Sequence, residues 1–474
     1  MNKTLFVAII CVALFSCNDD KSEVAPPVES EKTLKLDTLY SELFEAGKFN
    51  GNVLIAENGE VIFEKSFGLA DEAAKRKLNP ESIFELASVS KQFTAMGIVQ
   101  LAKQNKLQYE DSLSQYIPEL SHYKGITIAH LLVHTSGLPD YMDLAEEHWD
   151  STKIATNEDM IKLFQIQKPP VLFSPNEAYA YSNTGYMLLG TIIERVSGKS
   201  FGEFLKENIF APLGMNNTLV YRRRYAPRKI DNYASAYLYS DQHGRKMLPD
   251  SMASQSYVIY LDGIVGDGMV NSTVGDLLKW DRALYTNKLV NEMDKQAIFR
   301  SYYTADSSQT DYGFGWDIGS LKVYGKVVEH SGGWAGYYTH IERHLDNDKT
   351  IIVLQNNMME ETTMPLKNTR RILYDIPVEK PIALDSAILK SYEGIYVNSK
   401  GKERKIFYKE GKLYYPARPE TNVELIPVSQ VKFILEGFRP EVSFTFQMDQ
   451  NDQVTGCRVQ QPEQGVDRTM ARKE

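Results

Sequence analysis

The sequence has little cysteine, no excess of positive charge and no long hydrophobic run. Its 474 residues include only three cysteines, Cys11, Cys17 and Cys457, so no disulfide framework is available. Lys and Arg number 53 and Asp and Glu number 62, and the resulting net charge of −9 argues against nucleic acid as a partner. With 43% hydrophobic residues, the chain is too apolar for a disordered protein and is long enough to bury a large core.

Several signatures of catalysis are also missing. The sequence contains no Gly-x-Ser-x-Gly elbow, no His-Glu-x-x-His, no Cys-x-x-Cys and no glycine-rich phosphate loop. Its eight histidines are scattered and form no metal-ligand pattern. We therefore expect neither a metal nor a cofactor.

The N-terminus resembles an export signal. The apolar run over 5–15 is eleven residues long, whereas a membrane span needs about 20, so the pattern predicts a signal peptide over 1–16. Leu14-Phe15-Ser16-Cys17 resembles a bacterial lipobox, in which the cysteine is lipidated and becomes the new N-terminus. The alternative is an ordinary signal peptide with an incidental cysteine. Residues 17–33 suit a solvated tether. We expect an exported protein, lipid-anchored through Cys17 to a bacterial membrane at its periplasmic face or at the cell surface.

Hydrophobic periodicity predicts an α/β (α+β) domain over 34–376. Helical patterns cover 34–47, 88–105, 127–134, 157–166, 184–207, 273–286 and 366–374. One β-hairpin is predicted around Asn58-Gly59 and a second over 336–356. Strands at both ends of the domain, with helices between them, indicate an antiparallel sheet that is built from distant pieces of chain and flanked by helices.

Beyond Pro377 the pattern is entirely β. Strands are predicted over 392–396, 405–408, 412–415, 423–428, 431–435 and 442–448. They indicate a separate antiparallel domain over 377–474, either a sandwich or a small barrel. Cys457 in this domain is expected to be a buried small hydrophobe.

The motif Ser-x-x-Lys occurs four times, but only Ser88 and Lys91 lie at the start of a predicted long amphipathic helix. Residues three apart share one face of a helix, so Lys91 is predicted to lie against the Ser88 hydroxyl. The free N–H groups of a helix N-terminus favour developing negative charge. The alternative is that Ser88 is only an N-cap and Lys91 only a solvated residue.

Two further motifs contain groups suited to catalysis. Tyr181 and Asn183 form a Tyr-x-Asn motif in a loop just before a predicted helix. His330-Ser331-Gly332 follows a predicted strand, and with Gly333 it would let a substrate lie close against that strand and meet a free N–H. The alternatives are a tyrosine beside a turn asparagine and a bulge with an incidental histidine.

In this order the three motifs resemble the signature of the penicillin-recognising serine hydrolases. The version with Tyr-x-Asn resembles class C β-lactamases, their D,D-carboxypeptidase relatives and related esterases. Other matching phrases are Phe67-Gly68-Leu69-Ala70-Asp71, Leu131-Leu132-Val133-His134-Thr135-Ser136-Gly137-Leu138, Pro212-Leu213-Gly214-Met215 and Tyr312-Gly313-Phe314-Gly315-Trp316. The resemblance covers residues 34–375 and implies a β-lactamase-like sheet with a helical subdomain; the tail resembles the small β domains appended to such hydrolases.

The resemblance also implies roles for the residues. Ser88 would attack a carbonyl and form an acyl-enzyme, with Tyr181 and Lys91 sharing the role of general base. Asn183 would orient the substrate amide or Lys91. The backbone N–H groups of Ser88 and Gly333 would form the oxyanion hole.

The third motif implies the remaining substrate contacts. Gly332 and Gly333 would contact substrate, and His330 would bind a substrate carboxylate or tune Tyr181. His134 is expected to be a capping or packing residue.

One departure from the family pattern bears on the substrate. Dedicated β-lactamases of this type usually have Lys where His330 stands, and a His near pKa 6.5 is charged only partly at neutral pH. We therefore expect a peptidase of D-amino-acid substrates or an esterase rather than an efficient β-lactamase, with peptidoglycan fragments among the candidate substrates. If His330 must be cationic, KM for acidic substrates should worsen as the pH rises through about 6 to 7. The alternative function is a slow or silent binding protein for cell-wall peptides.

Overall fold

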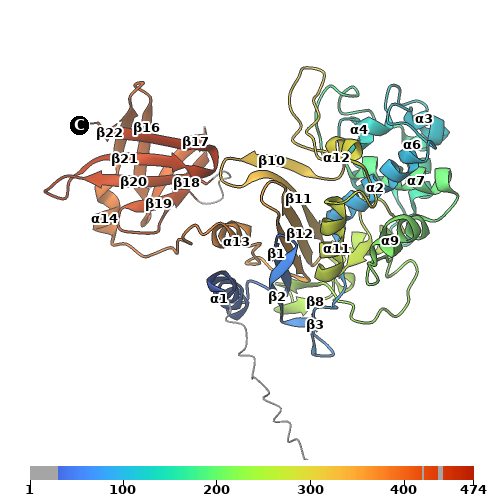
Figure 1. Ribbon diagram of the computed structural model, residues 1–474, viewed down its shortest axis with the longest axis horizontal. Helices are drawn as coiled ribbons and strands as arrows, with labels where there is room; N and C mark the ends of the chain where they lie inside the picture. The colour runs from blue at the N-terminus through green and yellow to red at the C-terminus, as the bar shows by residue number, and fades with distance from the viewer. Residues whose placement is uncertain (1–29, 419–420, 436–440, 474) are drawn as a thin grey trace, which may run out of the picture.

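The structure is a computed structural model that describes residues 30–473 except 419–420 and 436–440. Figure 1 shows two parts, a larger one in which helices surround a sheet and a barrel formed by the C-terminal residues. The predicted signal peptide, Cys17 and most of the tether lie outside the described residues. Within the described part of the chain, no helix is both long enough and apolar enough to cross a bilayer.

Six antiparallel strands form the central sheet in the order β10-β11-β12-β13-β1-β2. They span Asp317–Leu321 (β10), Gly325–Trp334 (β11), Tyr337–His344 (β12), Lys349–Gln355 (β13), Gly51–Glu57 (β1) and Glu60–Phe67 (β2). Both predicted hairpins are confirmed, because β1 pairs with β2 and β12 pairs with β13. In the first hairpin Asn58 and Gly59 have φ angles of 51° and 80°, as its tight turn requires.

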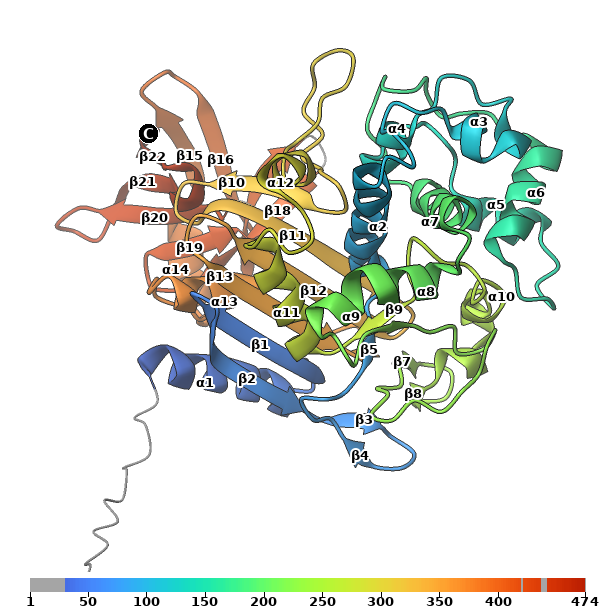
Figure 2. The same cartoon turned by 45° about the vertical axis from the view of Figure 1, so that its right-hand side comes forward.

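Helices cover both faces of this sheet. The first face is covered by α1 (Glu31–Glu45) and α13 (Leu366–Leu373), and the second by α11 (Val274–Leu284), which contacts β1 and β13. Side chains of β1 alternate between two cores, with Val53 packing on the α1 side and Leu54 on the α11 side. In Figure 2, α1 lies outside β1 and β2, and the helical subdomain lies at the other side of the molecule.

The helical subdomain consists of short helices around two longer ones. Its helices are α2 (Lys91–Lys103), α3 (Leu113–Tyr116), α4 (Ile128–Leu132), α5 (Tyr141–His148), α6 (Asn157–Gln167), α7 (Asn183–Ser197), α8 (Phe201–Leu205), α9 (Ala211–Leu213), α10 (Tyr257–Tyr260) and α12 (Glu292–Ile298). The single helix predicted over 184–207 is wrong. Gly198 ends α7 with a φ of 70°, and Ser200 begins α8 by forming a capping box with Glu203.

Small sheets join the subdomain to the central sheet. They contain β3 (Leu69–Asp71) with β4 (Arg76–Lys77), β5 (Phe84–Glu85) with β9 (Val270–Ser272) and β6 (Leu219–Val220), and β7 (Tyr237–Ser240) with β8 (Arg245–Met247) and β14 (Asn357–Met358). The strand β5 matters most for the site, since it leads directly into the turn that carries Ser88.

The C-terminal domain is a closed barrel of eight strands, which resolves the predicted choice between sandwich and barrel. After α14 (Ser386–Ser391), the strands are β15 (Gly394–Asn398), β16 (Glu403–Lys409), β17 (Lys412–Arg418), β18 (Thr421–Pro427), β19 (Lys432–Leu435), β20 (Ser443–Met448), β21 (Val454–Gln461) and β22 (Val466–Arg472). Strands β21 and β22 were not predicted from the sequence, although pairing of β22 with β15 closes the barrel. Cys457 is buried in the barrel core as expected, and this burial raises the pKa of its thiol to about 12.

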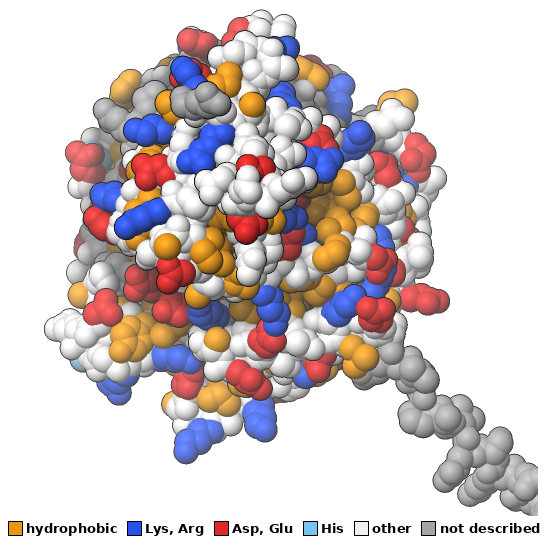
Figure 3. Space-filling view, turned by 90° about the vertical axis from the view of Figure 1, so that its left-hand side faces the viewer, with side chains coloured by type: hydrophobic (Ala, Val, Ile, Leu, Met, Phe, Trp, Pro, Cys, Tyr) orange, Lys and Arg blue, Asp and Glu red, His pale blue; other side chains and the backbone are white. Residues whose placement is uncertain are grey.

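The barrel contacts the larger domain through charged groups on α13. The Arg371 guanidinium donates a hydrogen bond of 2.8 Å to Glu441, and Lys367 pairs with the same carboxylate at 2.7 Å. On the face drawn in Figure 3, Lys and Arg side chains are interspersed with Asp and Glu side chains rather than gathered by sign. Electrostatic pairing therefore helps to hold the barrel against the rest of the chain.

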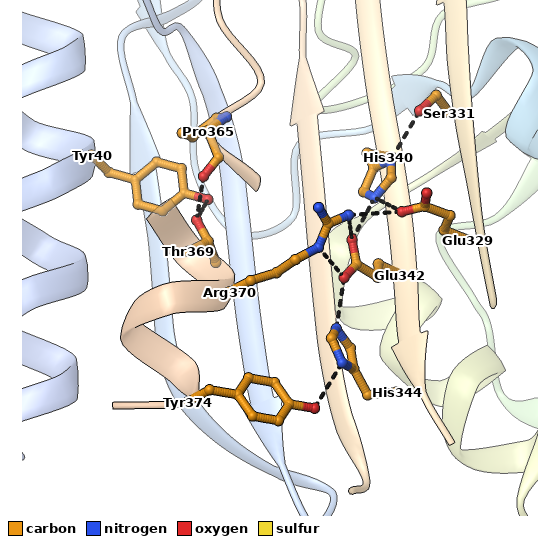
Figure 4. A network of polar contacts seen from close by, with 10 residues as sticks. All are labelled: Tyr40, Glu329, Ser331, His340, Glu342, His344, Pro365, Thr369, Arg370 and Tyr374. Carbon is orange, nitrogen blue, oxygen red and sulfur yellow. Dashed lines mark hydrogen bonds and ion pairs between the residues drawn. The ribbon is translucent and has the colours of Figure 1, made fainter. Parts of the chain in front are cut away.

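A buried ion network supports the strand that carries the third motif. In Figure 4, Arg370 of α13 reaches Glu342 of β12 and Glu329 of β11, while His340 links Glu342 to Ser331. Glu342 is fully buried, and burial alone would raise its pKa. The neighbouring Arg370 and the two histidines outweigh that effect and hold the pKa of this carboxyl well below its ordinary value.

This network also accounts for a cluster with metal-ligand chemistry. Glu329, His340 and Glu342 bring one ligand atom each within 4.8 Å of one another. Arg370 contacts both carboxylates, so the chain itself supplies the positive charge that they require. We interpret the cluster as structural, with Arg370 clamping α13 to β11 and β12.

Replacing Arg370 with Met should destabilise the fold strongly. The variant leaves Glu342 buried without its cation, which we expect to lower the free energy of unfolding by about 3–5 kcal/mol. Lys367→Met on the same helix is the matched control, because its side chain is 46% exposed, and it should cost at most about 1 kcal/mol. Urea denaturation measures both. Equal stability of the two variants would contradict the clamp.

Candidate active site

Ser88 lies in a strained turn between β5 and α2. Residues Ala87–Ser90 form a 3₁₀ turn, and Ala87 has a φ of 49°, a left-handed conformation that is costly for a residue with a Cβ. The N–H of Leu86 donates to the carbonyl of Val270 at 2.8 Å and fixes the start of the turn. The prediction that Ser88 begins the α-helix itself is therefore wrong by one turn, since α2 starts at Lys91.

The ammonium group of Lys91 connects three segments of the chain. Lys91 is completely buried, and its Nζ donates to Ser88 Oγ at 3.1 Å, to Asn183 Oδ1 at 3.0 Å and to the carbonyl of Asp267 at 3.0 Å. Three acceptors satisfy all three N–H donors of a lysine ammonium. The alternative in which Lys91 is a solvated surface residue is wrong.

The Tyr-x-Asn motif lies at the start of α7. Asn183 accepts from Lys91 through Oδ1 and donates through Nδ2 to Asp140 at 3.1 Å, so its amide is fixed at both ends. The ring centroid of Tyr181 lies 4.9 Å from Lys91 Nζ. The Tyr181 side chain is 42% exposed, and among the described residues its hydroxyl has no hydrogen-bond partner. That hydroxyl is free to contact a substrate.

His134 fixes the segment that carries Tyr181. Its Nδ1 accepts a hydrogen bond of 3.0 Å from the backbone N–H of Ser182, and its ring centroid lies 4.4 Å from that of Tyr181. Burial and the nearby Lys91 lower the pKa of His134 well below 6.5. The predicted packing role of His134 agrees with these contacts.

Asp267 is a site residue that the sequence analysis missed. Besides accepting from Lys91 through its carbonyl, it accepts through its carboxylate from the Tyr141 hydroxyl at 2.8 Å. Burial raises the pKa of this carboxyl, against the opposing effect of Lys91. The glycines that flank it, Gly266 and Gly268, were the available signal, because a Gly-x-Gly segment allows close approach of the backbone.

The third motif places β11 directly beside the Ser88 turn. A Cβ on Gly332 would lie 2.2 Å from the carbonyl oxygen of Leu86 and 3.1 Å from the backbone nitrogen of Ser88, so only glycine fits there. Gly333 faces open space and lines the same cavity as Ser88. This arrangement agrees with an oxyanion hole formed by the N–H groups of Ser88 and Gly333, which stays a prediction.

His330 is not the cation that the sequence analysis considered. The residue is buried, its Nδ1 donates to the carbonyl of Ser331 at 2.7 Å, and its Nε2 accepts from the Tyr312 hydroxyl at 2.9 Å. Burial, with a further contribution from Lys91, lowers the pKa of His330 to about 3. A neutral imidazole with both nitrogens occupied cannot bind a substrate carboxylate as an imidazolium. Its ring centroid lies 6.2 Å from that of Tyr181, so a tuning role remains a prediction.

A cavity of about 470 Å³ opens beside Ser88. Most of its wall is apolar or aromatic, from Met142, Leu238, Tyr257, Leu261, Ile264, Trp334 and Met358. Glu85 and Asp267 contribute two carboxyl groups, whereas no Lys or Arg is among the described lining residues. Trp334 is therefore a wall residue, while Trp316 is buried in the core. The cavity is large enough for an amino-acid-sized acyl group.

Comparisons with known proteins agree with this geometry. The profile of the family described as Beta-lactamase matches residues 36–375. Penicillin-binding protein 4* of Bacillus subtilis (strain 168) is 42% identical over 435 residues, which cover 89% of this chain and 96% of that protein.

Two solved structures are similar over most of their length. The octameric penicillin-binding protein homologue from Pyrococcus abyssi is 25% identical with a TM-score of 0.63, covering 92% of this chain and 99% of that one. The D-amino acid amidase from Ochrobactrum anthropi SV3 in complex with D-phenylalanine has a TM-score of 0.60 at 22% identity, covering 73% of this chain and 98% of that one, which is a likeness of fold alone.

We expect KM for acidic substrates to stay flat between pH 5 and 8. With a pKa of about 3, His330 is neutral throughout this range and cannot lose charge as the pH rises. The measurement is KM for the 4-nitrophenyl monoester of succinate across the range, with uncharged 4-nitrophenyl butyrate as the control. A KM that rises several-fold between pH 5 and 7 for the acidic ester alone would restore the cationic role.

Proposed function

The chain belongs to the beta-lactamase family and is a serine hydrolase; from that premise we propose that it forms an acyl-enzyme on Ser88 with small peptides, amides or esters. The observation that carries the proposal is the convergence of Ser88, Lys91 and Asn183 through hydrogen bonds of 3.0–3.1 Å beside a cavity. Peptides that contain D-amino acids are the preferred substrates, and simple esters come next.

The reaction follows from the contacts of Ser88. Its Oγ attacks the substrate carbonyl, and its proton passes to the pair formed by Lys91 and Tyr181, which accepts it in the form of the pair that has already released one proton to solvent. The backbone N–H groups of Ser88 and Gly333 stabilise the oxyanion, and each such donor is worth about 3–4 kcal/mol in the transition state. The pair then protonates the leaving amine or alcohol. Water attacks the resulting ester of Ser88, which releases the acid and restores the hydroxyl.

The cavity supports a substrate other than a β-lactam. A β-lactam has a carboxylate near its reactive carbonyl, whereas Glu85 and Asp267 place carboxyl groups in the wall and His330 is neutral. The relative named penicillin-binding protein 4* supports a cell-wall peptide as substrate. The fold shared with a D-amino acid amidase is compatible with the same class.

We expect a fluorophosphonate probe to label the native protein and Ser88→Ala to abolish labelling. The variant should also lose about 10⁴-fold or more in kcat, because the remaining groups act only with the nucleophile. Ser121→Ala is the matched control, since Ser121 belongs to a second Ser-x-x-Lys sequence and lies on the surface after a 3₁₀ turn.

The same proteins are tested against a D-Ala-D-Ala peptide, a nitrophenyl ester and a chromogenic cephalosporin. We expect the peptide or the ester to be hydrolysed faster than the cephalosporin. Tight binding of peptidoglycan fragments that is unchanged in Ser88→Ala, with no turnover of any substrate, would favour the silent binding protein instead.

We also propose that the chain is exported and lipid-anchored through Cys17. The apolar run over 5–15 and the lipobox-like Leu14-Phe15-Ser16-Cys17 support this proposal. Expressed in a bacterium fed a clickable fatty acid, the native protein should be labelled and recovered with membranes, whereas Cys17→Ser should lose both properties. Cys11→Ser, inside the apolar run, is the control. Labelling that survives Cys17→Ser would contradict the anchor.

A further inference from the structure

Glu85 is a buried carboxyl in the wall of the catalytic cavity with no bonding partner. The residue is 6% exposed, it lies three positions before Ser88, and both residues line the same cavity. Among the described residues, no hydrogen bond or ion pair reaches its side chain. Burying a carboxyl without a hydrogen-bond partner lowers the stability of the fold more than burying one that has a partner, so this arrangement calls for an explanation.

The surroundings of Glu85 do not satisfy it. The cations that lower the pKa of Glu85 are Arg224 and Arg223, but Arg224 pairs with Asp250 at 2.6 Å and with Asp262 at 2.9 Å, and Arg223 pairs with Asp250 as well. The phenols of Tyr233 and Tyr337, whose pKa values Glu85 raises, bond to each other at 3.0 Å. In the cavity itself, Asp267 adds a second carboxyl, and Lys91 is saturated by its own three acceptors.

The rest of the wall suits a ligand that has both an ammonium group and an apolar side chain. Tyr257 and Trp334 line the cavity, and aromatic rings of this kind can attract an ammonium group. Leu238, Leu261 and Ile264 offer apolar surface for a side chain. No Lys or Arg of the described lining residues would repel such a ligand.

We propose that Glu85 is the specificity-determining residue that binds a free amino group on the acyl half of the substrate. The substrate class is then amides, esters or short peptides whose acylating residue is apolar and unblocked at its N-terminus. This inference rests on the proposed acyl-enzyme function. It restricts the substrates through the positive charge on their acyl half and leaves the leaving group unspecified.

Binding of the ammonium group has a proton balance that can be measured. Burial raises the pKa of Glu85 to about 8, so at pH 7 the carboxyl carries its proton in the empty cavity. An ammonium group beside it favours the carboxylate, and the displaced proton goes to solvent. Ligands without the amino group leave the proton where it is.

The kinetic test compares the 4-nitroanilide of D-phenylalanine with its desamino analogue, 3-phenylpropanoic acid 4-nitroanilide, at pH 6.5. We expect kcat/KM of the native protein to be higher for the D-phenylalanine anilide than for the analogue. Glu85→Gln should lower kcat/KM for the D-phenylalanine anilide by about 10- to 100-fold and change it little for the analogue. Glu81→Gln is the matched control, because it makes the same substitution at an exposed glutamate outside the cavity.

A binding test separates this inference from the catalytic proposal. In the Ser88→Ala background, calorimetry of D-phenylalanine amide in two buffers of different ionisation enthalpy should show release of nearly one proton per ligand. Adding Glu85→Gln should abolish that release, and 3-phenylpropanamide should cause none in either protein. If the native protein turns over no substrate but this proton release is observed, the proposed hydrolysis through Ser88 is overturned while the role of Glu85 stands. If Glu85→Gln lowers kcat/KM equally for both anilides, or if proton release persists in Glu85→Gln, the proposed role of Glu85 is overturned.

Discussion

The site depends on the placement of one buried positive charge. Lys91 has no exposed surface, and a buried ammonium is tolerated only when its donors are satisfied. Its acceptors come from three segments: the Ser88 turn, the start of α7 at Asn183, and the loop of Asp267. Folding that satisfies Lys91 therefore also assembles the nucleophile and its neighbours. Stability and catalytic geometry here have the same cause.

Close backbone packing makes this convergence possible. Gly266 has a φ of 108°, and a Cβ there would lie 2.3 Å from the carbonyl of Tyr186, so the loop of Asp267 can rest directly on α7. Gly332 plays the matching part on β11, against the Ser88 turn. The Arg370 network then supports β11 from the opposite face of the sheet. Two glycine contacts and one ion network thus hold the cavity walls in place.

The charges of the cavity differ from those expected for the family pattern. From the sequence, His330 was expected to be a weaker substitute for a lysine cation, whereas burial and the contact with Tyr312 make it a neutral member of a hydrogen-bond chain. The carboxyls of Glu85 and Asp267 are then the prominent ionisable groups in the wall. Such a cavity is suited to ligands that are neutral or positively charged at the acyl end.

The sequence by itself determined the antiparallel sheet, the family-like order of the three motifs and the β character of the tail, because alternation, turn residues and motif spacing are local properties. It did not determine the break at Gly198 or the strands β21 and β22, whose polar residues hide their alternation. Only the tertiary structure decided the protonation of His330, the part played by Asp267 and the isolation of Glu85. These depend on burial and on groups that folding brings together, as between Lys91 and Asp267, which are 176 residues apart, and no local pattern records them.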